Sequence, residues 1–520
     1  MLKAVKTAGL LLLVATFALA ATPEEDEAAL THNDIREPLV PVTGKPVPPG
    51  VASILKQNSA CGPIWETDVQ WDSDIRLTSN IADDWTDNSK QSVCVDPAGR
   101  IHVVWYSYRE QPVSLTPQIF YKRYNPGSGW TSDTCISGDV ANILSCRAPS
   151  IACDSAGNIH VIWLAGYSST HQILYKMCTP TGSGNGGWQL SSTYLSTSPS
   201  DWYKGAPDVA CTPDNHVHVV WEEGNVSLGR WLVYREKIGT TWQRPFHVDS
   251  SGYDLQMASV GGSRDNNVRV AYMCTPFIQI FSRSRINGVW GPIENVSNGA
   301  SIQMYPSIAC NPVTNNPHIV WQGYDPNSSC WRIIHSYRTS GGWQPRDTVS
   351  EWPSSTYQQL FPDMEFTPDG TGHVVWCGQS QASPSDTQIR YNERSPAGVW
   401  GTPINLTNVT GSSRYYPSIA NGGNSTNPND LHVVWSDFRH GNSEIYYKHG
   451  SRVVDVAATA ILRPRALVYI NDVVTPQATV ANYGSEPAVF NLRFVIMDAT
   501  DAIVYDTTEE VSLGVGATED

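Results

Sequence analysis

Charge, long apolar runs and helical periodicity are all scarce in this chain. Only 16% of its 520 residues are charged, and their balance is acidic, with a formal net charge of −15. Nucleic-acid binding needs concentrated Lys and Arg, so the composition argues against a phosphate-backbone partner. Beyond residue 20 no run reaches the ~18 apolar residues of a membrane span, so we expect none in the mature chain. Because no segment has a convincing helical period, an all-β protein is the expected class.

Motifs for metals and cofactors are also missing. No CxxC pair or His/Cys cluster has zinc-site spacing, and we expect no cofactor. One stretch, DDWTDN at residues 83–88, gathers three carboxylates and an amide, which are ligands that Ca²⁺ prefers. It lacks the Gly and terminal Glu of an EF-hand loop. We therefore interpret it as a solvated acidic turn, with calcium as the weaker alternative.

The eleven cysteines are an odd number, so at least one has no partner within the chain. Cys135 and Cys146 flank one short loop and are candidates for a disulfide in an oxidising compartment. Cys330 and Cys377 lie in comparable loops and form a second candidate pair. Three further cysteines occupy matching places in SIACD, DVACT and SIACN, and we interpret them as small buried apolar side chains: Cys153, Cys211 and Cys310.

The first 64 residues lack the pattern of a packed core. Lys3 and Lys6 precede an apolar run, and Ala18-Leu19-Ala20 supplies small residues for cleavage, so residues 1–20 are predicted to be a secretory signal peptide. No Cys follows the cleavage site, which argues against a lipid anchor. Residues 21–64 are acidic and then Pro-rich, and we expect an extended leader. The mature protein is therefore predicted to be secreted or held at the cell surface.

A repeat fills the centre of the chain. The pattern His-Val-Val-Trp, or a close variant, recurs at intervals of 49 to 59 residues, and each copy is accompanied by three other strand-like pieces. The copies end at Trp105, Trp163, Trp221, Tyr272 (in the degenerate VRVAY), Trp321, Trp376 and Trp435. Four strands at such a period are typical of β-propeller blades. Both faces of each repeat strand should be buried, because blades pack on neighbours at both sides.

The last repeat lacks a fourth strand, and the sequence before the first repeat supplies one. VQWDSDIRLTSN, residues 69–80, has the Trp and the ending of a fourth strand but no other strands of its own. We expect it to pair with the strand that carries Tyr446 and Tyr447. Such closure removes an exposed sheet edge. The sequence therefore predicts a seven-bladed β-propeller over residues 65–452.

These repeats resemble the sialidase-like, BNR-type propellers of bacterial secreted proteins, with HVVWSDFRHGNSEIYYK at residues 432–448 as the clearest copy. The resemblance implies the fold rather than an activity. No Asp box is present, and no Arg triad, Tyr–Glu pair or Asp acid can be assigned, so we predict no catalytic residue. Residues 453–520 change pattern, and VTPQATVANYGSEPAVF resembles a CARDB-type adhesion module. An immunoglobulin-like β-sandwich, possibly truncated, is expected there.

Polar and aromatic residues gather in two sets of loops that should open at one end of the propeller. Aromatic rings beside Arg and Asp form surfaces that suit sugars. The predicted ligand-binding residues are Trp85, Tyr106, Arg109, Tyr167, Trp202, Tyr203, Tyr324, Asp325, Tyr416, Asp437 and Arg439. Tyr253, Tyr305, Tyr357 and Tyr415 lie in the same loops. The His of each repeat strand is instead expected to be a hydrogen-bonded structural residue.

Three functions remain open at this point. The leading hypothesis is a secreted binding or adhesion protein whose propeller face binds a glycan or a cell-surface protein. The second is a sialidase-like glycoside hydrolase, for which Glu222, Glu223 and Asp437 are the carboxylates to inspect. The third is a structural module of a larger surface protein. The missing catalytic set favours binding, and fold alone does not decide function.

Overall fold

The computed structural model describes residues 3–7, 10–16 and 69–520, with gaps at 87–90, 110–115, 141–144, 168–169, 182–183, 199–201, 226–228, 250–252, 300, 351–356, 423–428, 453–455, 464–474, 476, 483–487, 498–502 and 515. Two compact units divide the chain, residues 71–451 and residues 1–70 with 452–520. The regular elements described in both are β-strands. Among the described residues there is no helix long and apolar enough to cross a membrane. The predicted leader, residues 21–64, lies outside the described residues.

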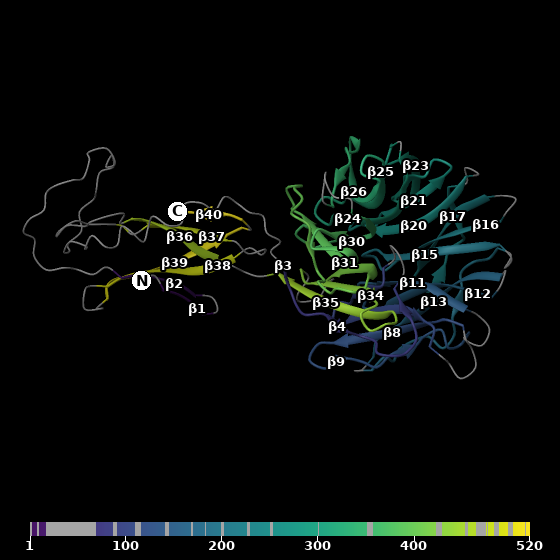
Figure 1. Cartoon of the computed structure of the whole chain (residues 1–520), viewed down its shortest axis with the longest axis horizontal. Coiled ribbons are helices and arrows are strands. Elements are labelled where there is room, and N and C mark those ends of the chain that lie inside the picture. The colour runs from purple at the N-terminus through teal and green to yellow at the C-terminus, as the bar shows by residue number, and fades with distance from the viewer. Residues whose placement is uncertain are drawn as a thin grey trace, which may run out of the picture. The chain divides into compact units, whose positions relative to one another are not determined.

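The larger unit consists of antiparallel sheets that follow one another along the chain, numbered here 1 to 7 (Figure 1). Sheet 1 contains β5 (Asp84–Trp85), β6 (Val93–Val95), β7 (Ile101–Ser107), β8 (Gln118–Asn125), β9 (Gly129–Trp130) and β10 (Thr134–Cys135). Sheet 2 contains β11 (Ser145–Cys153), β12 (Ile159–Tyr167), β13 (Thr170–Cys178) and β14 (Thr193–Tyr194). Sheet 3 contains β15 (Tyr203–Cys211), β16 (Val217–Asn225), β17 (Gly229–Ile238), β18 (Thr241–Trp242) and β19 (Phe246–Asp249).

The remaining sheets keep the same order of strands. Sheet 4 contains β20 (Asp254–Gly262), β21 (Val268–Thr275), β22 (Gln279–Ile286) and β23 (Val289–Asn295). Sheet 5 contains β24 (Gln303–Cys310), β25 (Pro317–Asp325), β26 (Cys330–Thr339), β27 (Gly342–Trp343) and β28 (Asp347–Thr348). Sheet 6 contains β29 (Gln359–Phe366), β30 (Gly372–Ser380), β31 (Ser383–Arg394) and β32 (Ile404–Asn405). Sheet 7 joins β33 (Arg414–Asn421), β34 (Leu431–Asp437) and β35 (Glu444–Arg452) to β3 (Val69–Trp71) and β4 (Ile75–Arg76).

The repeat strands form the core of this unit. The Trp that ends each His-Val-Val-Trp pattern has no exposed surface, and neither has Tyr272 in the degenerate copy. Apolar side chains lie on both faces of these strands and form clusters between successive sheets, such as the cluster of Val161 and Trp163 with Tyr121. The expectation of two buried faces is confirmed. Removing one such Trp side chain should cost about 3–5 kcal/mol of stability.

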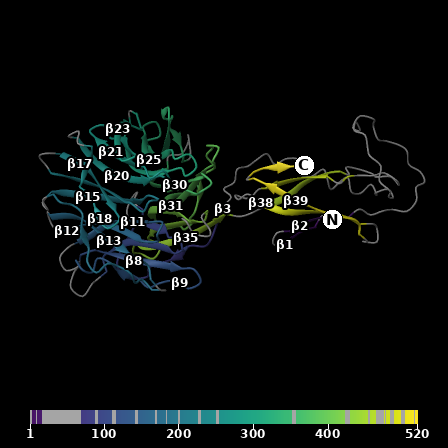
Figure 2. The ribbon, with the colours of Figure 1, turned by 180° about the vertical axis from the view of Figure 1, so that it is seen from behind.

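The series of sheets closes on itself. The first strand of each sheet contacts the first strand of the next, and β33 of sheet 7 contacts β6 of sheet 1. Both views place β8 beside β35, although these strands come from opposite ends of the unit (Figures 1 and 2). The first strands line a central cavity of about 270 Å³.

In sheets 2 to 7 a Ser or Asp at one position of the first strand bonds a neighbouring sheet around this cavity, and in sheet 1 the amide of Ser92 donates to Ser418 Oγ. Asp208 accepts hydrogen bonds from Ser150 Oγ at 2.8 Å and from the Val260 amide at 2.9 Å. Asp363 is held in the same way by Ser307 and by the Ile419 amide. Burial raises the pKa of Asp363 to about 6 against the effect of these bonds. The equivalent positions are Ser92, Ser150, Asp208, Ser259, Ser307, Asp363 and Ser418.

The N-terminal strand pairs with the last repeat, as predicted. In the antiparallel register of β4 and β35, Ile75 lies opposite Tyr447 and Arg76 opposite Tyr446. Ion pairs reinforce the junction, because Asp74 binds Arg439 at 2.8 Å and Lys448 at 3.0 Å. Strands more than 360 residues apart therefore complete one sheet.

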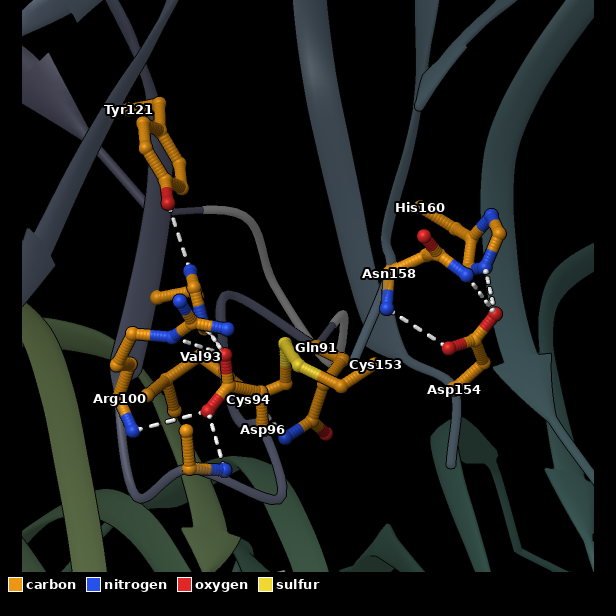
Figure 3. The surroundings of a disulfide bond; sticks show 12 residues. Gln91, Val93, Cys94, Asp96, Arg100, Tyr121, Cys153, Asp154, Asn158 and His160 are labelled. Atoms are coloured by element: carbon orange, nitrogen blue, oxygen red, sulfur yellow. Dashed lines mark hydrogen bonds and ion pairs between the residues drawn. A yellow bond between two sulfur atoms is a disulfide. The ribbon is translucent and has the colours of Figure 1, made fainter. Parts of the chain in front are cut away.

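The repeat histidines are structural, as expected. In five sheets Nδ1 lies 2.6–2.8 Å from the hydroxyl of a third-strand Tyr, and the pairs are His102–Tyr121, His160–Tyr175, His218–Tyr234, His373–Tyr391 and His432–Tyr447. In sheets 1 and 2 Nε2 contacts a carboxylate in the turn after the first strand, Asp96 or Asp154, at 3.1 Å (Figure 3). Burial lowers the pKa of four of them, His102, His160, His218 and His432, and keeps these imidazoles neutral. No group of three metal-ligating side chains occurs among the described residues.

The disulfide predictions were wrong. Cys94 and Cys153 form the bond that the structure contains, joining β6 to β11 with a Cα–Cα distance of 6.0 Å (Figure 3). Cys153 is therefore not merely a buried apolar side chain, whereas Cys211 and Cys310 are free and half-buried.

Neither predicted pair forms, because none of Cys135, Cys146, Cys330 and Cys377 is disulfide-bonded. Cys146 lies in the apolar cluster between sheets 1 and 2, whereas Cys135 packs against the cluster between sheets 7 and 1. Cys330 accepts a hydrogen bond from Gln358, while the Cys377 thiol donates to the Leu360 carbonyl. The members of each pair thus face different surroundings.

The smaller unit contains two sheets. One has the order β1 (Lys3–Thr7), β2 (Leu10–Thr16), β38 (Ala488–Met497) and β39 (Ile503–Leu513), and the other joins β36 (Val456–Arg463), β37 (Gln477–Asn482) and β40 (Thr518–Glu519). Ala478, Val480, Leu492 and Leu513 belong to its core. Part of the predicted signal peptide is thus paired with β38, and its cleavage stays a prediction.

Candidate functional site

A bulge repeats where the first strands begin. The register with the second strand shifts at this point in sheets 2 to 7. In several sheets the residue two positions before the conserved Ser or Asp has a positive φ, and it is large: Met257 (58°), Tyr305 (54°), Phe361 (54°) and Tyr416 (54°). A bulky residue in the left-handed region costs roughly 1–2 kcal/mol. Backbone strain at the same position of several sheets indicates that the orientation of these side chains has a function.

Side chains of the preceding sheet hold these bulges. In sheets 3 and 5 the residue that follows the repeat Trp accepts the amide hydrogen of the strained residue in the next sheet. Glu222 Oε1 accepts from Met257 N at 2.5 Å, and Gln322 Oε1 accepts from Phe361 N at 3.1 Å. One oxygen of the Glu222 carboxylate is thereby committed to the fold, whereas Oε2 lies 3.8 Å from Arg230 Nη1.

The strained rings lie side by side in an aromatic arc, defined here as Tyr305, Phe361, Tyr416, Trp85 and Phe438. Ring centroids are 4.8 Å apart for Tyr305 and Phe361, and 4.9 Å apart for Phe361 and Tyr416. The arc continues from Tyr416 to Trp85 at 6.1 Å and from Trp85 to Phe438 at 5.1 Å. All five rings are half-exposed. The arc spans sheets 5, 6, 7 and 1. It lies at the N-terminal ends of the first strands, and therefore at one opening of the central cavity.

A second cluster lies in sheet 3. Tyr203 hydrogen-bonds Glu222, and burial together with that carboxylate raises the pKa of the phenol. The guanidinium of Arg230 lies 4.0 Å from the centroid of the Tyr203 ring. The ring also lies across Gly205, where a Cβ would come 2.3 Å from the Tyr203 hydroxyl. A carboxylate, a phenol and a cation thus meet at one point.

Three charged residues predicted to bind a ligand are engaged in ion pairs within the fold. Arg109 bridges Asp84 at 2.9 Å and Asp133 at 2.5 Å. Asp437 is 1% exposed and accepts hydrogen bonds from Trp435 and Arg439. The pKa of Asp437 is lowered, because these hydrogen bonds outweigh burial. We therefore leave Arg109, Asp437 and Arg439 out of the site.

The remaining predicted residues fall in different places. Trp202 packs on Trp231 beside Tyr203, and Tyr106 is half-buried against Tyr108. Tyr324 and Asp325 line a cavity in sheet 5. The side chain of Tyr167 lies outside the described residues. The structure thus places Trp85 next to Tyr416. It also places Tyr324 next to Asp325. The predicted ligand-binding residues do not, however, form one surface.

The other carboxylates proposed from the sequence have structural partners. Glu223 accepts the indole N–H of Trp221 at 2.9 Å, which is the role that Asp437 has for Trp435. In the acidic turn, Asp83 accepts the Ser443 amide, and Asp84 binds Arg109. Asp87 and Asn88 lie outside the described residues.

Sequence reasoning missed Phe361, Phe438 and the strain that places the rings. A signal was available in Phe361-Pro362-Asp363, which aligns with Tyr305-Pro306-Ser307 and Tyr416-Pro417-Ser418. An aromatic residue before Pro and the conserved Ser or Asp marks the arc.

No protein-family model matches the chain, and no curated protein sequence matches it. Solved structures do resemble it in fold. A polysaccharide lyase of family PL25, an ulvan lyase, is 12% identical with a TM-score of 0.50, over 72% of this chain and 95% of that one. An intramolecular trans-sialidase from Ruminococcus gnavus is 9% identical with a TM-score of 0.38, over 71% of this chain and 96% of that one.

A protein of unknown function from Dyadobacter fermentans is 11% identical with a TM-score of 0.45, and the match covers 74% of this chain and all of that one. At such identities the likeness shows the fold alone.

Proposed function

We propose that the larger unit is a seven-bladed β-propeller, closed by the N-terminal strand, that binds a glycan through the aromatic arc. The smaller unit would be an immunoglobulin-like, CARDB-type adhesion module of a protein that is secreted or held at the cell surface. The observation that carries the proposal is the arc, in which three half-exposed rings, Tyr305, Phe361 and Tyr416, are held at strained bulges.

Half-exposed rings suit sugars because the apolar faces of pyranose rings stack on aromatic side chains. Trp and Tyr also carry a polar group that can reach sugar hydroxyls. Several adjacent aromatic rings favour an oligosaccharide over a single sugar, because one sugar stacks on one aromatic ring. The central cavity below the arc lies between the first strands and is lined largely by small side chains and backbone.

The test is a binding measurement on a panel of immobilised oligosaccharides with the full chain. Tyr416→Ala should weaken saturable binding at least tenfold, because it removes the ring that contacts both Phe361 and Trp85. The matched control is Tyr194→Ala, since Tyr194 is 52% exposed on β14, the last strand of sheet 2. Equal binding by both variants, or no glycan bound at all, would overturn the proposal.

A glycan-cleaving enzyme is the second candidate, and the cluster of Tyr203, Glu222 and Arg230 favours it. A phenol beside a carboxylate and a cation is a set from which acid–base chemistry can be built. Product release from the bound oligosaccharides, lost in Tyr203→Phe, would establish that function. Binding without release would reject it. A chain that neither binds nor cleaves fits the third hypothesis, a structural module.

A further inference from the structure

A cavity in sheet 5 lies beside the aromatic arc. Its volume is about 240 Å³. That is smaller than the ~300–1,000 Å³ of sites for drug-sized ligands, so it suits one sugar residue or a single substituent. The lining residues are Ser301, Gln303, Gly323, Tyr324, Asp325, Pro326, Arg332, Ile334, Arg346, Asp347 and Thr348. Gln303 stands two residues before Tyr305 on β24, so the cavity and the arc share a strand.

Both carboxylates of this lining have a polar partner within the fold. Asp325 accepts hydrogen bonds from Ser328 Oγ at 2.6 Å and the Asn327 amide at 3.0 Å, and these bonds lower its pKa. Asp347 lies 3.5 Å from His335 Nδ1, and that interaction lowers its pKa.

The cationic groups are placed differently. Arg332 is fully buried, and its guanidinium donates to the Tyr357 carbonyl at 3.3 Å and to Ser328 Oγ at 3.0 Å. Arg346 is exposed at the rim, where its Nη1 would lie 2.6 Å from a Cβ on Gly299. Within the described part of the chain, no carboxylate lies within ion-pair distance of Arg346. The planar guanidinium of Arg346 is therefore available to donate hydrogen bonds to a ligand.

Neutral groups of the lining complete the arrangement. Gln303 is fixed, because its oxygen accepts the indole N–H of Trp321 at 2.5 Å and its nitrogen donates to Ser301 Oγ at 2.7 Å. Gly323 leaves room for this amide, since a Cβ there would come 2.5 Å from Gln303 Oε1. Tyr324 is half-exposed against Trp331, with ring centroids 5.4 Å apart. The cavity thus has a fixed polar floor, an aromatic side and a cation at its rim.

We propose that this cavity is an acid-group subsite, in which Arg346 binds the carboxylate or sulfate of an acidic sugar while the neighbouring sugars lie on the aromatic arc. The inference rests on the proposed glycan binding and specifies the class of glycan. Arg346 is the specificity-determining residue, and Tyr324 packs beside the substituted sugar. Because the chain carries a net charge of −15, recognition depends on this local cation and not on long-range attraction.

The experiment compares three probes on the full chain: oligogalacturonate, which carries carboxylates, an oligosaccharide of sulfated galactan, and neutral galactan of the same length. At least one acidic probe should bind ten times more tightly than the neutral one. Arg346→Gln should remove most of that preference. Arg346→Lys keeps the charge but not the planar fork, so it should restore part of the preference.

The control variant is Arg244→Gln, which removes an exposed arginine from the segment between β18 and β19 of sheet 3. Loss of preference in Arg346→Gln but not in Arg244→Gln supports the subsite and excludes a general charge effect. Equal affinity for acidic and neutral probes, or a preference that survives Arg346→Gln, would overturn the inference. Glycan binding that is lost in Tyr416→Ala would still stand in that case, so the two proposals fail separately.

Discussion

Acid should destabilise this protein through histidines that the repeat buries in neutral form. Burial lowers the pKa of both His218 and His432 to about 3, from an ordinary value of 6.5. His218 is held between Thr212 and Tyr234 at 2.8 Å each, and His432 lies 2.8 Å from Tyr447. These hydroxyls satisfy a neutral imidazole, and the nearby carboxylates of Asp214 and Asp430 offset only part of the effect of burial on the pKa.

The sign and size follow from linkage. A group whose pKa is lowered in the folded state binds its proton more readily when unfolded, so its contribution is intact above pH 6.5 and declines as the pH falls towards 3. Each pH unit below 6.5 costs about 1.4 kcal/mol per histidine. At pH 5 each of the two has lost about 2 kcal/mol, which makes about 4 kcal/mol for the pair.

The assay is urea unfolding of the wild type and of a His218→Gln, His432→Gln double variant between pH 7.5 and 5.0. The variant is less stable at pH 7.5 but should lose about 4 kcal/mol less than the wild type on acidification. Val219→Ala serves as the control, because it weakens the same buried strand while keeping both histidines. His449, whose pKa is raised by hydrogen bonds to Asp430 and Asp72, acts in the opposite direction and cancels in the comparison. A double variant with the same pH dependence as the wild type would refute the reasoning.

Two further predictions concern the first strands. Ala152 and Cys211 stand in the positions of sheets 2 and 3 that Cys94 and Cys153 occupy in sheets 1 and 2, so Ala152→Cys should form a second inter-sheet disulfide. Because Cys211 is a free thiol in the wild type, the variant should have one free thiol fewer than the wild type, and one additional thiol would contradict this. At Phe361, where φ is 54°, Gly should be more stable than Ala by about 1 kcal/mol in urea unfolding, because Gly adopts the left-handed region without strain; an Ala variant as stable as Gly would show that the bulge is unstrained.

The fold was largely readable because it is repeated. Each His-Val-Val-Trp copy places apolar residues on both faces of a strand. The same pattern in the other copies supports each strand assignment. The closing strand could also be found, since the last repeat lacked a partner for Tyr446 and Tyr447 and residues 69–80 lacked a sheet. The repeat histidines could be assigned a structural role for the same reason: a feature present in nearly every copy serves what all copies share.

The contacts between copies could not be read in this way. Cys94 stands one position earlier in its strand than Cys153 does in the next, so aligning the repeats hides the bond between them. Arg439 follows a repeat Trp as though it faced solvent, but its partner Asp74 comes from the other end of the unit. The sequence shows which residues occupy a loop. It does not show which charged residue of a distant strand forms an ion pair with them.

Departures from the repeat are therefore the better guide to function in this architecture. After the repeat Trp, Glu222 and Gln322 hold the next bulge, and the residue held there varies from copy to copy. Sheet 2 has Ala148 at the strained position, sheet 4 has Met257, and sheets 5 to 7 have Tyr305, Phe361 and Tyr416. The backbone strain is common to these sheets, whereas aromatic rings occupy only consecutive ones. If the fold alone required aromatic side chains at this position, they would occur in all the sheets and not only in sheets 5 to 7. This uneven distribution supports the proposed ligand, which would lie across that side of the propeller.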